Sequence, residues 1–119
     1  FRRMYDAVLA AQAAGLAAIR PGVRMCDVDA AARKVLRAAG MAREFSHSLG
    51  HGLGLDIHEA PRLSKRTEDV LEPGMVVTVE PGVYFAGIGG IRIEDDVLVT
   101  PDGSRVLTSL PKDLASMVV

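Results

Sequence analysis

The sequence contains one cysteine, Cys26, and almost no excess of charge of either sign. A single cysteine cannot form an internal disulfide, which favours a reducing compartment, and we therefore expect a cytoplasmic protein. The formal net charge of −1 gives no reason to expect nucleic acid or a membrane surface as a partner. No apolar run approaches the roughly 20 residues of a membrane-spanning helix. The first residues, FRRMYDAV, contain no apolar signal-peptide segment.

The chain of 119 residues also lacks an initiator methionine, so we expect a processed product or a piece of a longer protein. Its apolar fraction of 49% and its charged fraction of 24% are close to those of globular domains. This length is sufficient for one domain with a hydrophobic core. The composition therefore predicts one folded unit and excludes a disordered tail.

The first part of the chain predicts two helices with small apolar faces. From Tyr5 to Ile19 the apolar residues recur with helical spacing and alanines fill the gaps, until Pro21-Gly22 ends the pattern. A second helix follows, with Asp27 as its expected N-cap and Gly40 as the expected residue after its C-terminus.

Beyond these helices, glycines and β-branched residues predict strands. We expect strands at 75–80, 83–85 and 91–100, and a hairpin return at 105–108 after a turn at 101–104. The charged segment 62–69 is expected to be an exposed loop. Two helices followed by a mostly antiparallel sheet predict an α+β fold.

Two of the expected strands contain carboxylates. Alternation along the strand at 91–100 places Arg92 and Glu94 on one face. Glu80 ends the other strand, and Pro81 restricts it to extended geometry. Taken alone, these residues also fit a solvated ion pair and a strand end. If the two strands are neighbours, Glu80 and Glu94 converge, and convergent carboxylates share a proton or a cation.

All three histidines lie in the segment 47–58, where interspersed glycines allow sharp turns. A single histidine in such a loop is more often structural than functional. One imidazole, His51, together with Glu80 and Glu94 is a different case, because this donor set suits a divalent metal ion with open coordination positions.

Four segments resemble, in order, the C-terminal part of the catalytic domain of the pita-bread metallopeptidases (family M24). They are FSHSLGHGLGLDIHEAP, LEPGMVVTVEPGVY, GIRIEDDVLVTPDG and VLTSLPKDL. The helical start AAIRPGVRMCDVDAAARKVLRAAG is similar to the helix pair that precedes the histidine motif in that family. The last two segments are more similar to Xaa-Pro dipeptidases and aminopeptidases than to methionine aminopeptidases. The resemblance implies a metal-dependent exopeptidase that cleaves Xaa-Pro bonds by a metal-bridging hydroxide.

The resemblance also implies a metal site. His51, Glu80 and Glu94 resemble metal ligands of the family, which holds two divalent ions; we expect Mn²⁺ or Co²⁺ before Zn²⁺. The family uses two further aspartate ligands upstream of the first helix, and no aspartate near the two helices of this chain matches them. We therefore expect residues 1–119 to be a partial catalytic domain that is inactive in isolation.

Other residues resemble those that act on the substrate. Glu80 is similar to the residue that also moves protons around the attacking water, and His58 to the histidine that contacts the substrate or the tetrahedral intermediate. His47 resembles a histidine of the substrate cleft, and Arg92 an arginine that supports the ligands. The implied partner is a proline-containing peptide, and a homodimer is expected for the whole protein.

Three other functions share this fold. They are a non-catalytic peptide-binding or protein-binding pseudo-peptidase, a methionine aminopeptidase, and a metal-independent hydrolase similar to creatinase. A pseudo-enzyme or a metal-independent enzyme has no need of His51, Glu80 and Glu94 together, so their joint presence favours the peptidase.

Overall fold

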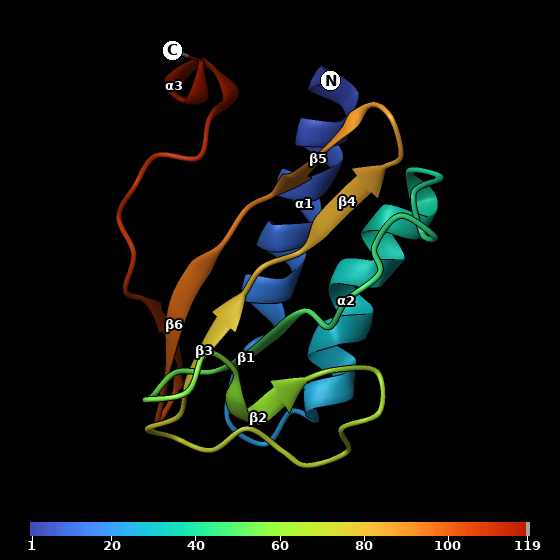
Figure 1. The fold of residues 1–119 in the computed structure, drawn as a ribbon. Coiled ribbons are helices and arrows are strands. Elements are labelled where there is room, and N and C mark those ends of the chain that lie inside the picture. Colours follow the sequence, from blue (N-terminus) through green and yellow to red (C-terminus); the bar gives the residue numbers. More distant parts are fainter. Residues whose placement is uncertain (119) are drawn as a thin grey trace.

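The computed structural model describes residues 1–118, in which a pair of helices packs on one side of the strands (Figure 1). The elements, in chain order, are α1 (Arg2–Ala18), α2 (Met25–Ala38), β1 (Gly50–Gly52), β2 (Glu59–Leu63), β3 (Val76–Val79), β4 (Gly82–Phe85), β5 (Gly89–Arg92), β6 (Asp95–Thr100), β7 (Gly103–Val106) and α3 (Leu114–Met117). The expected α+β architecture is confirmed. Within the described residues, every helix is too short or too polar to span a bilayer.

Five strands form one antiparallel sheet in the order β2-β1-β3-β6-β7, and β4 and β5 form a separate hairpin. At the centre, β3 pairs with β1 at Gly52 and Val77 and with β6 along its whole length. Helix α1 contacts β3, β4 and β5, and α2 contacts β2. The helices therefore cover one side of the strands, as Figure 1 shows.

Helices α1 and α2 pack against each other and against the strands, and each has one buried face, as the apolar periodicity predicts. Their buried residues are Tyr5, Val8, Ala11, Gln12 and Gly15 in α1, and Met25, Val28, Asp29, Ala32 and Leu36 in α2. These positions recur at intervals of three and four residues, which places them on one side of each helix. The exceptions to apolar character are Gln12 and Asp29, and both have polar partners in the core.

Helix α2 begins earlier than the sequence predicts. It starts at Met25 with Arg24 as its N-cap, so Asp27 lies within the first turn and is not the cap. Asp27 instead pairs with the Arg24 side chain, at 2.9 Å between Oδ2 and Nε. Its negative charge is still favourable there, near the positive end of the helix dipole. The other end follows the prediction, because Gly40 adopts a φ of 76°, which glycine tolerates.

The long strand expected at 91–100 is in fact two strands. β5 ends at Arg92 and pairs with β4, whereas β6 begins at Asp95 and pairs with β3. The chain changes partners between these residues, which local periodicity does not reveal. The alternation of faces continues through the break, since Ile93 is buried and Glu94 is exposed.

Part of the charged segment 62–69 is strand and not loop, contrary to the prediction. Arg62 and Leu63 end β2, where they pair with His51 and Gly50 of β1. The side chain of Leu63 is fully buried. This single apolar residue among charged neighbours marks the end of a strand that the average polarity of the segment conceals.

A buried carboxylate connects the C-terminal segment to the sheet and to α1. Asp95 is 2% exposed and accepts hydrogen bonds from Gln12, Thr108 and Lys112, with Lys112 Nζ 2.8 Å from Oδ2. Burial by itself would raise the pKa of Asp95, but these hydrogen bonds outweigh it and the pKa is lowered. The LPKDL motif therefore supplies the cation for a charge in the core.

Replacing Lys112 by methionine leaves the buried Asp95 with neutral donors only. We expect Lys112→Met to lower the free energy of unfolding at neutral pH by about 2 kcal/mol, the contribution typical of a hydrogen bond to a charged group. Because the folded pKa of Asp95 is lowered, this stabilisation is present above its unfolded value of about 3.9 and is lost as the pH falls through the folded pKa. Urea unfolding at neutral and acidic pH measures both effects. Lys34→Met, at an exposed position of α2, is the control, and equal effects of the two substitutions would contradict the role of Lys112.

Gly50 lies where β1 approaches the backbone of β3. A Cβ atom at Gly50 would be 1.7 Å from the Thr78 carbonyl oxygen, so a larger residue forces the strands apart. We expect Gly50→Ala to lower the free energy of unfolding by about 3 kcal/mol, measured by chemical denaturation. Gly103→Ala is the matched control, because its Cβ would meet no atom nearer than 4.0 Å, and we expect a change within about 0.5 kcal/mol. Equal free energies of unfolding of the two variants would contradict this prediction, because they would show that β1 and β3 accommodate a methyl group at Gly50.

Candidate functional site

The histidine segment enters the sheet through β1. Gly50 and Gly52 are buried, and His51 between them is partly buried. The N–H of His51 donates to the hydroxyl of Thr78 at 3.0 Å. This contact with β3 therefore holds the backbone that carries the imidazole, at a point where the pairing of β1 with β2 shifts register between His51 and Gly52.

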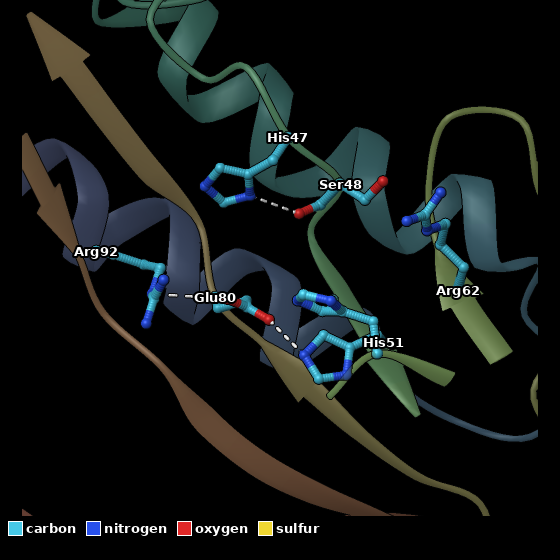
Figure 2. A pocket seen from close by; sticks show the side chains of 8 residues that line it. His47, Ser48, His51, Arg62, Glu80 and Arg92 are labelled. Atoms are coloured by element: carbon cyan, nitrogen blue, oxygen red, sulfur yellow. Dashed lines mark hydrogen bonds and ion pairs between the residues drawn. The ribbon is translucent and has the colours of Figure 1, made fainter. Parts of the chain in front are cut away.

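His51 and Glu80 meet at the centre of the site (Figure 2). His51 Nε2 is 3.0 Å from Glu80 Oε1, and the side chains are only 14% and 12% exposed. The Nδ1 atom lies 2.8 Å from the Gly52 carbonyl oxygen, which only accepts, so in the neutral ring Nδ1 has the proton and Nε2 presents a lone pair. The Thr78 hydroxyl donates to the same Glu80 oxygen at 2.9 Å. A lone pair and a carboxylate oxygen at this distance attract a shared cation, either a proton or a metal ion.

Arg92 joins the two predicted carboxylate ligands. Its Nε is 3.6 Å from Glu80 Oε2, and its Nη2 is 3.4 Å from Glu94 Oε2. The strands explain this convergence, because antiparallel pairing of β3 and β6 places Val79 opposite Asp95, next to Glu80 and Glu94. Long-range pairing thus brings both carboxylates to one arginine.

The pKa of Glu94 is raised above its ordinary value. Burial is the main cause and the negative charge of Glu80 the next, while Arg92 acts in the opposite direction. The side chain of Glu94 is still 38% exposed, so a cation could reach it from solvent. A cation near both carboxylates would relieve the repulsion between them.

A pocket of about 280 Å³ opens beside these residues (Figure 2). It is lined by His47, Ser48, Gly50, His51, His58, Arg62, Glu80 and Arg92. All the site residues predicted from the sequence, apart from Glu94, therefore line one cavity.

The two remaining histidines line the same pocket as His51. His47 Nε2 is 2.8 Å from the Tyr84 hydroxyl, which belongs to β4. The ring of His58 packs edge to face against the ring of His51, with 4.7 Å between centroids. A neighbouring side chain thus orients each of these rings.

Thr78, Tyr84, Ser48 and Arg62 belong to the site but were not predicted from the sequence. A signal for Thr78 was available, because alternation places it on the same face as Glu80. No comparable signal exists for Arg62, which reaches the pocket because β2 pairs with β1 and sets it opposite His51.

Among residues 1–118, no group of three histidine, cysteine, aspartate or glutamate side chains is close enough to hold a metal ion. His51 and Glu80 nevertheless present two donors to a common point, and Glu94 lies on the other side of Arg92. One imidazole nitrogen with carboxylate oxygens is a donor set that Mn²⁺, Co²⁺ and Zn²⁺ accept. These residues fit part of a metal-ligand set, and their individual roles stay predictions.

Known proteins resemble this chain in sequence and in structure. The chain is 50% identical over 113 residues to the uncharacterized peptidase YqhT of Bacillus subtilis and 46% identical over 113 residues to the Xaa-Pro dipeptidase of Pyrococcus furiosus. Both alignments cover 95% of this chain and 32% of the relative. A solved structure, the Xaa-Pro dipeptidase from Bacillus anthracis, matches with a TM-score of 0.92 and 50% identity, over 95% of this chain and 32% of that one.

The chain thus spans about a third of the length of the relatives that it matches. The structural likeness confirms the fold expected for part of a pita-bread domain. The sequence profile of Peptidase_M24, described as metallopeptidase family M24, matches residues 1–101. This match covers most of the chain, which therefore belongs to metallopeptidase family M24.

Proposed function

We propose that this chain is part of a metal-dependent exopeptidase that cleaves Xaa-Pro bonds in dipeptides or short peptides. The observation that carries the proposal is the contact between His51 and Glu80, with Arg92 linking Glu80 to Glu94, in a chain of family M24. The names of the relatives from Pyrococcus furiosus and Bacillus anthracis, both Xaa-Pro dipeptidases, support this substrate class.

In this proposal His51, Glu80 and Glu94 hold divalent metal, and two aspartates supplied by the whole protein complete the ligands of a two-metal site. One nitrogen and several carboxylate oxygens favour Mn²⁺ or Co²⁺ over Zn²⁺. When bound, the metal lowers the pKa of a water molecule and polarises the scissile carbonyl group.

In this proposal, residues of the chain transfer the proton, position the carboxylates and bind the substrate. Glu80 accepts a proton from the attacking water and passes it to the leaving proline nitrogen. Arg92 keeps the two carboxylates close in spite of their repulsion. His58 donates a hydrogen bond to the developing oxyanion, and His47, oriented by Tyr84, lines the cleft that takes the substrate.

The proposal extends to the setting of the enzyme. Its partner is a peptide that contains proline, and the whole protein forms a homodimer. Its compartment is the cytoplasm, where a single cysteine such as Cys26 stays reduced. Residues 1–119 in isolation contribute only part of the ligand set, so we propose that they are inactive alone.

The main test measures proline release from an Xaa-Pro dipeptide by the natural gene product with added Mn²⁺ or Co²⁺. We expect Glu80→Gln to lower kcat/KM by about 10²- to 10⁴-fold, the usual contribution of a general acid-base group. Glu72→Gln is the matched control, because Glu72 also precedes Pro-Gly but is exposed and lies outside the pocket.

Two results would count against this function. Equal activity of the two glutamine variants would exclude Glu80 from the chemistry. A gene product that binds Xaa-Pro peptides without releasing proline, whatever metal is added, would support the non-catalytic alternative.

Arg62 brings a positive charge to the wall of the pocket, and a dipeptide ends in a carboxylate. We expect Arg62→Met to raise KM for an Xaa-Pro dipeptide about 10-fold, as loss of one charge-assisted hydrogen bond would. KM for the corresponding dipeptide amide, which has no carboxylate, should change little. Arg105→Met on β7 is the control, and equal effects of Arg62→Met on both substrates would contradict a contact with the carboxylate.

A further inference from the structure

A buried ion pair on α2 lies behind the histidine segment and has no part in the chemistry proposed above. The side chain of Asp29 is fully buried, and that of Arg33, one helical turn later, is 22% exposed. The two meet side on, with 2.5 Å between Arg33 Nε and Asp29 Oδ2 and 3.3 Å between Nη2 and Oδ1. Stability alone does not explain such a pair, because replacing a buried ion pair by well-packed apolar residues of similar volume often leaves the free energy of unfolding unchanged or higher.

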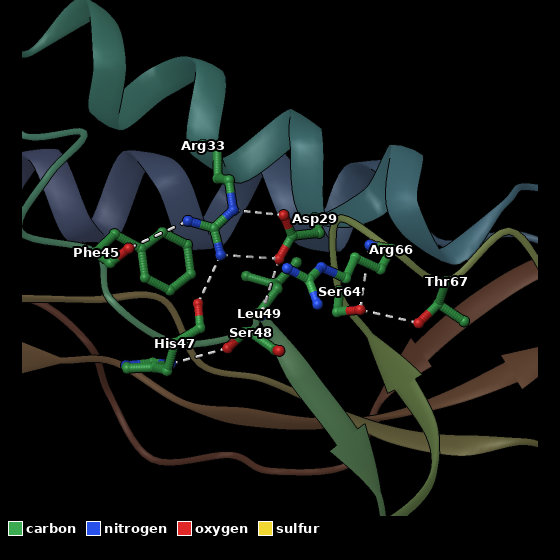
Figure 3. Close-up of polar contacts among 9 residues, drawn as sticks. All are labelled: Asp29, Arg33, Phe45, His47, Ser48, Leu49, Ser64, Arg66 and Thr67. Atoms are coloured by element: carbon green, nitrogen blue, oxygen red, sulfur yellow. Dashed lines mark hydrogen bonds and ion pairs between the residues drawn. The ribbon is translucent and has the colours of Figure 1, made fainter.

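The pair reaches the backbone of residues 45–49 (Figure 3). Arg33 donates from Nη1 to the carbonyl oxygen of Phe45 at 3.1 Å and from Nη2 to that of His47 at 2.6 Å. Asp29 Oδ1 accepts the N–H of Leu49 at 3.0 Å. The guanidinium also lies over the ring of Phe45, with Cζ 4.2 Å from the centroid. Alternate residues of this segment are thus attached to α2.

These attachments lie immediately before the residues of the site. His47 lines the pocket and contacts Tyr84. The carbonyl oxygen of Leu49 accepts the N–H of Glu80 at 2.8 Å, and His51 follows two residues later in β1. The segment has no regular structure before Gly50, so the bonds to α2 help to set its path. Leu49 N–H is shared, since it also donates to the carbonyl oxygen of Leu63 in β2 at 2.9 Å.

We infer that Asp29 and Arg33 are positioning residues, which hold residues 45–49 so that His47 and His51 keep their places beside Glu80. The guanidinium is required for this because its planar fork binds a carboxylate and two carbonyl oxygens at once, whereas an ammonium group is a single point of contact. The expected effect on turnover rests on the proposed function. The expected effect on the positions of His47 and His51 does not.

The test compares Arg33→Lys with Arg24→Lys in the natural gene product. Arg24 is a matched control because it pairs with Asp27 through two hydrogen bonds on the same helix, at an exposed position away from residues 45–49. NMR spectra of protein with labelled histidine rings give the first readout. We expect Arg33→Lys to shift the ring signals of His47 and His51, and Arg24→Lys to leave them unchanged.

Turnover and hydrogen exchange give two further readouts. We expect kcat/KM on an Xaa-Pro dipeptide to fall about 10- to 100-fold in Arg33→Lys, as for other small displacements of catalytic groups, and to stay within about two-fold in Arg24→Lys. In the unaltered protein, the Nε–H of Arg33 should exchange with water more slowly than that of Arg24. This third readout does not depend on whether a variant folds.

Two results would overturn the inference. One is a folded Arg33→Lys protein whose His47 and His51 signals match those of the unaltered protein. The other is equally fast exchange at Arg33 and Arg24. An inactive gene product that still shows slow exchange at Arg33 and shifted histidine signals in Arg33→Lys would refute the proposed function and support the positioning role.

Discussion

The central place of β3 in the sheet is the constraint on which the rest of the structure depends. Its pairing with β1 brings the histidine segment to Glu80, and its pairing with β6 brings Glu94 to the same point. These segments are distant in the sequence and meet only because one strand hydrogen-bonds to both. The contact of His51 with Glu80 follows from that arrangement, while Arg92 reaches the two carboxylates from the separate β4–β5 hairpin.

Two buried aspartates support the site segments from the core side. Asp95 directly follows Glu94 and connects β6 to α1 and to the C-terminal segment. Asp29 accepts a backbone hydrogen bond two residues before His51. Each of these charges has a cationic partner, which offsets the cost of its burial. Asp29 therefore holds the backbone just before His51, and Asp95 links the side chains of three segments of the chain.

Glu80 and Glu94 repel each other at the site, so an added cation would be favourable beside them. The raised pKa of Glu94 reflects burial and the nearby charge of Glu80, and Arg92 compensates only part of this. His51 turns a ring nitrogen to the same carboxylate. Two repelling acids beside an imidazole suit the cation that the proposed function places there.

The sequence by itself determined the two helices, the family and the faces of the strands. Alternation placed Arg92 and Glu94 on one face, and the ordered motifs identified the peptidase family. Both signals depend only on residues that are close together in the sequence. Only the tertiary structure decided which strands pair. It divided the predicted strand at 91–100, brought Arg62 into the pocket and gave Asp29 its role behind the histidines. The physical reason is that local periodicity specifies which face a side chain takes, whereas its partners depend on hydrogen bonds and packing between segments that are far apart in the chain.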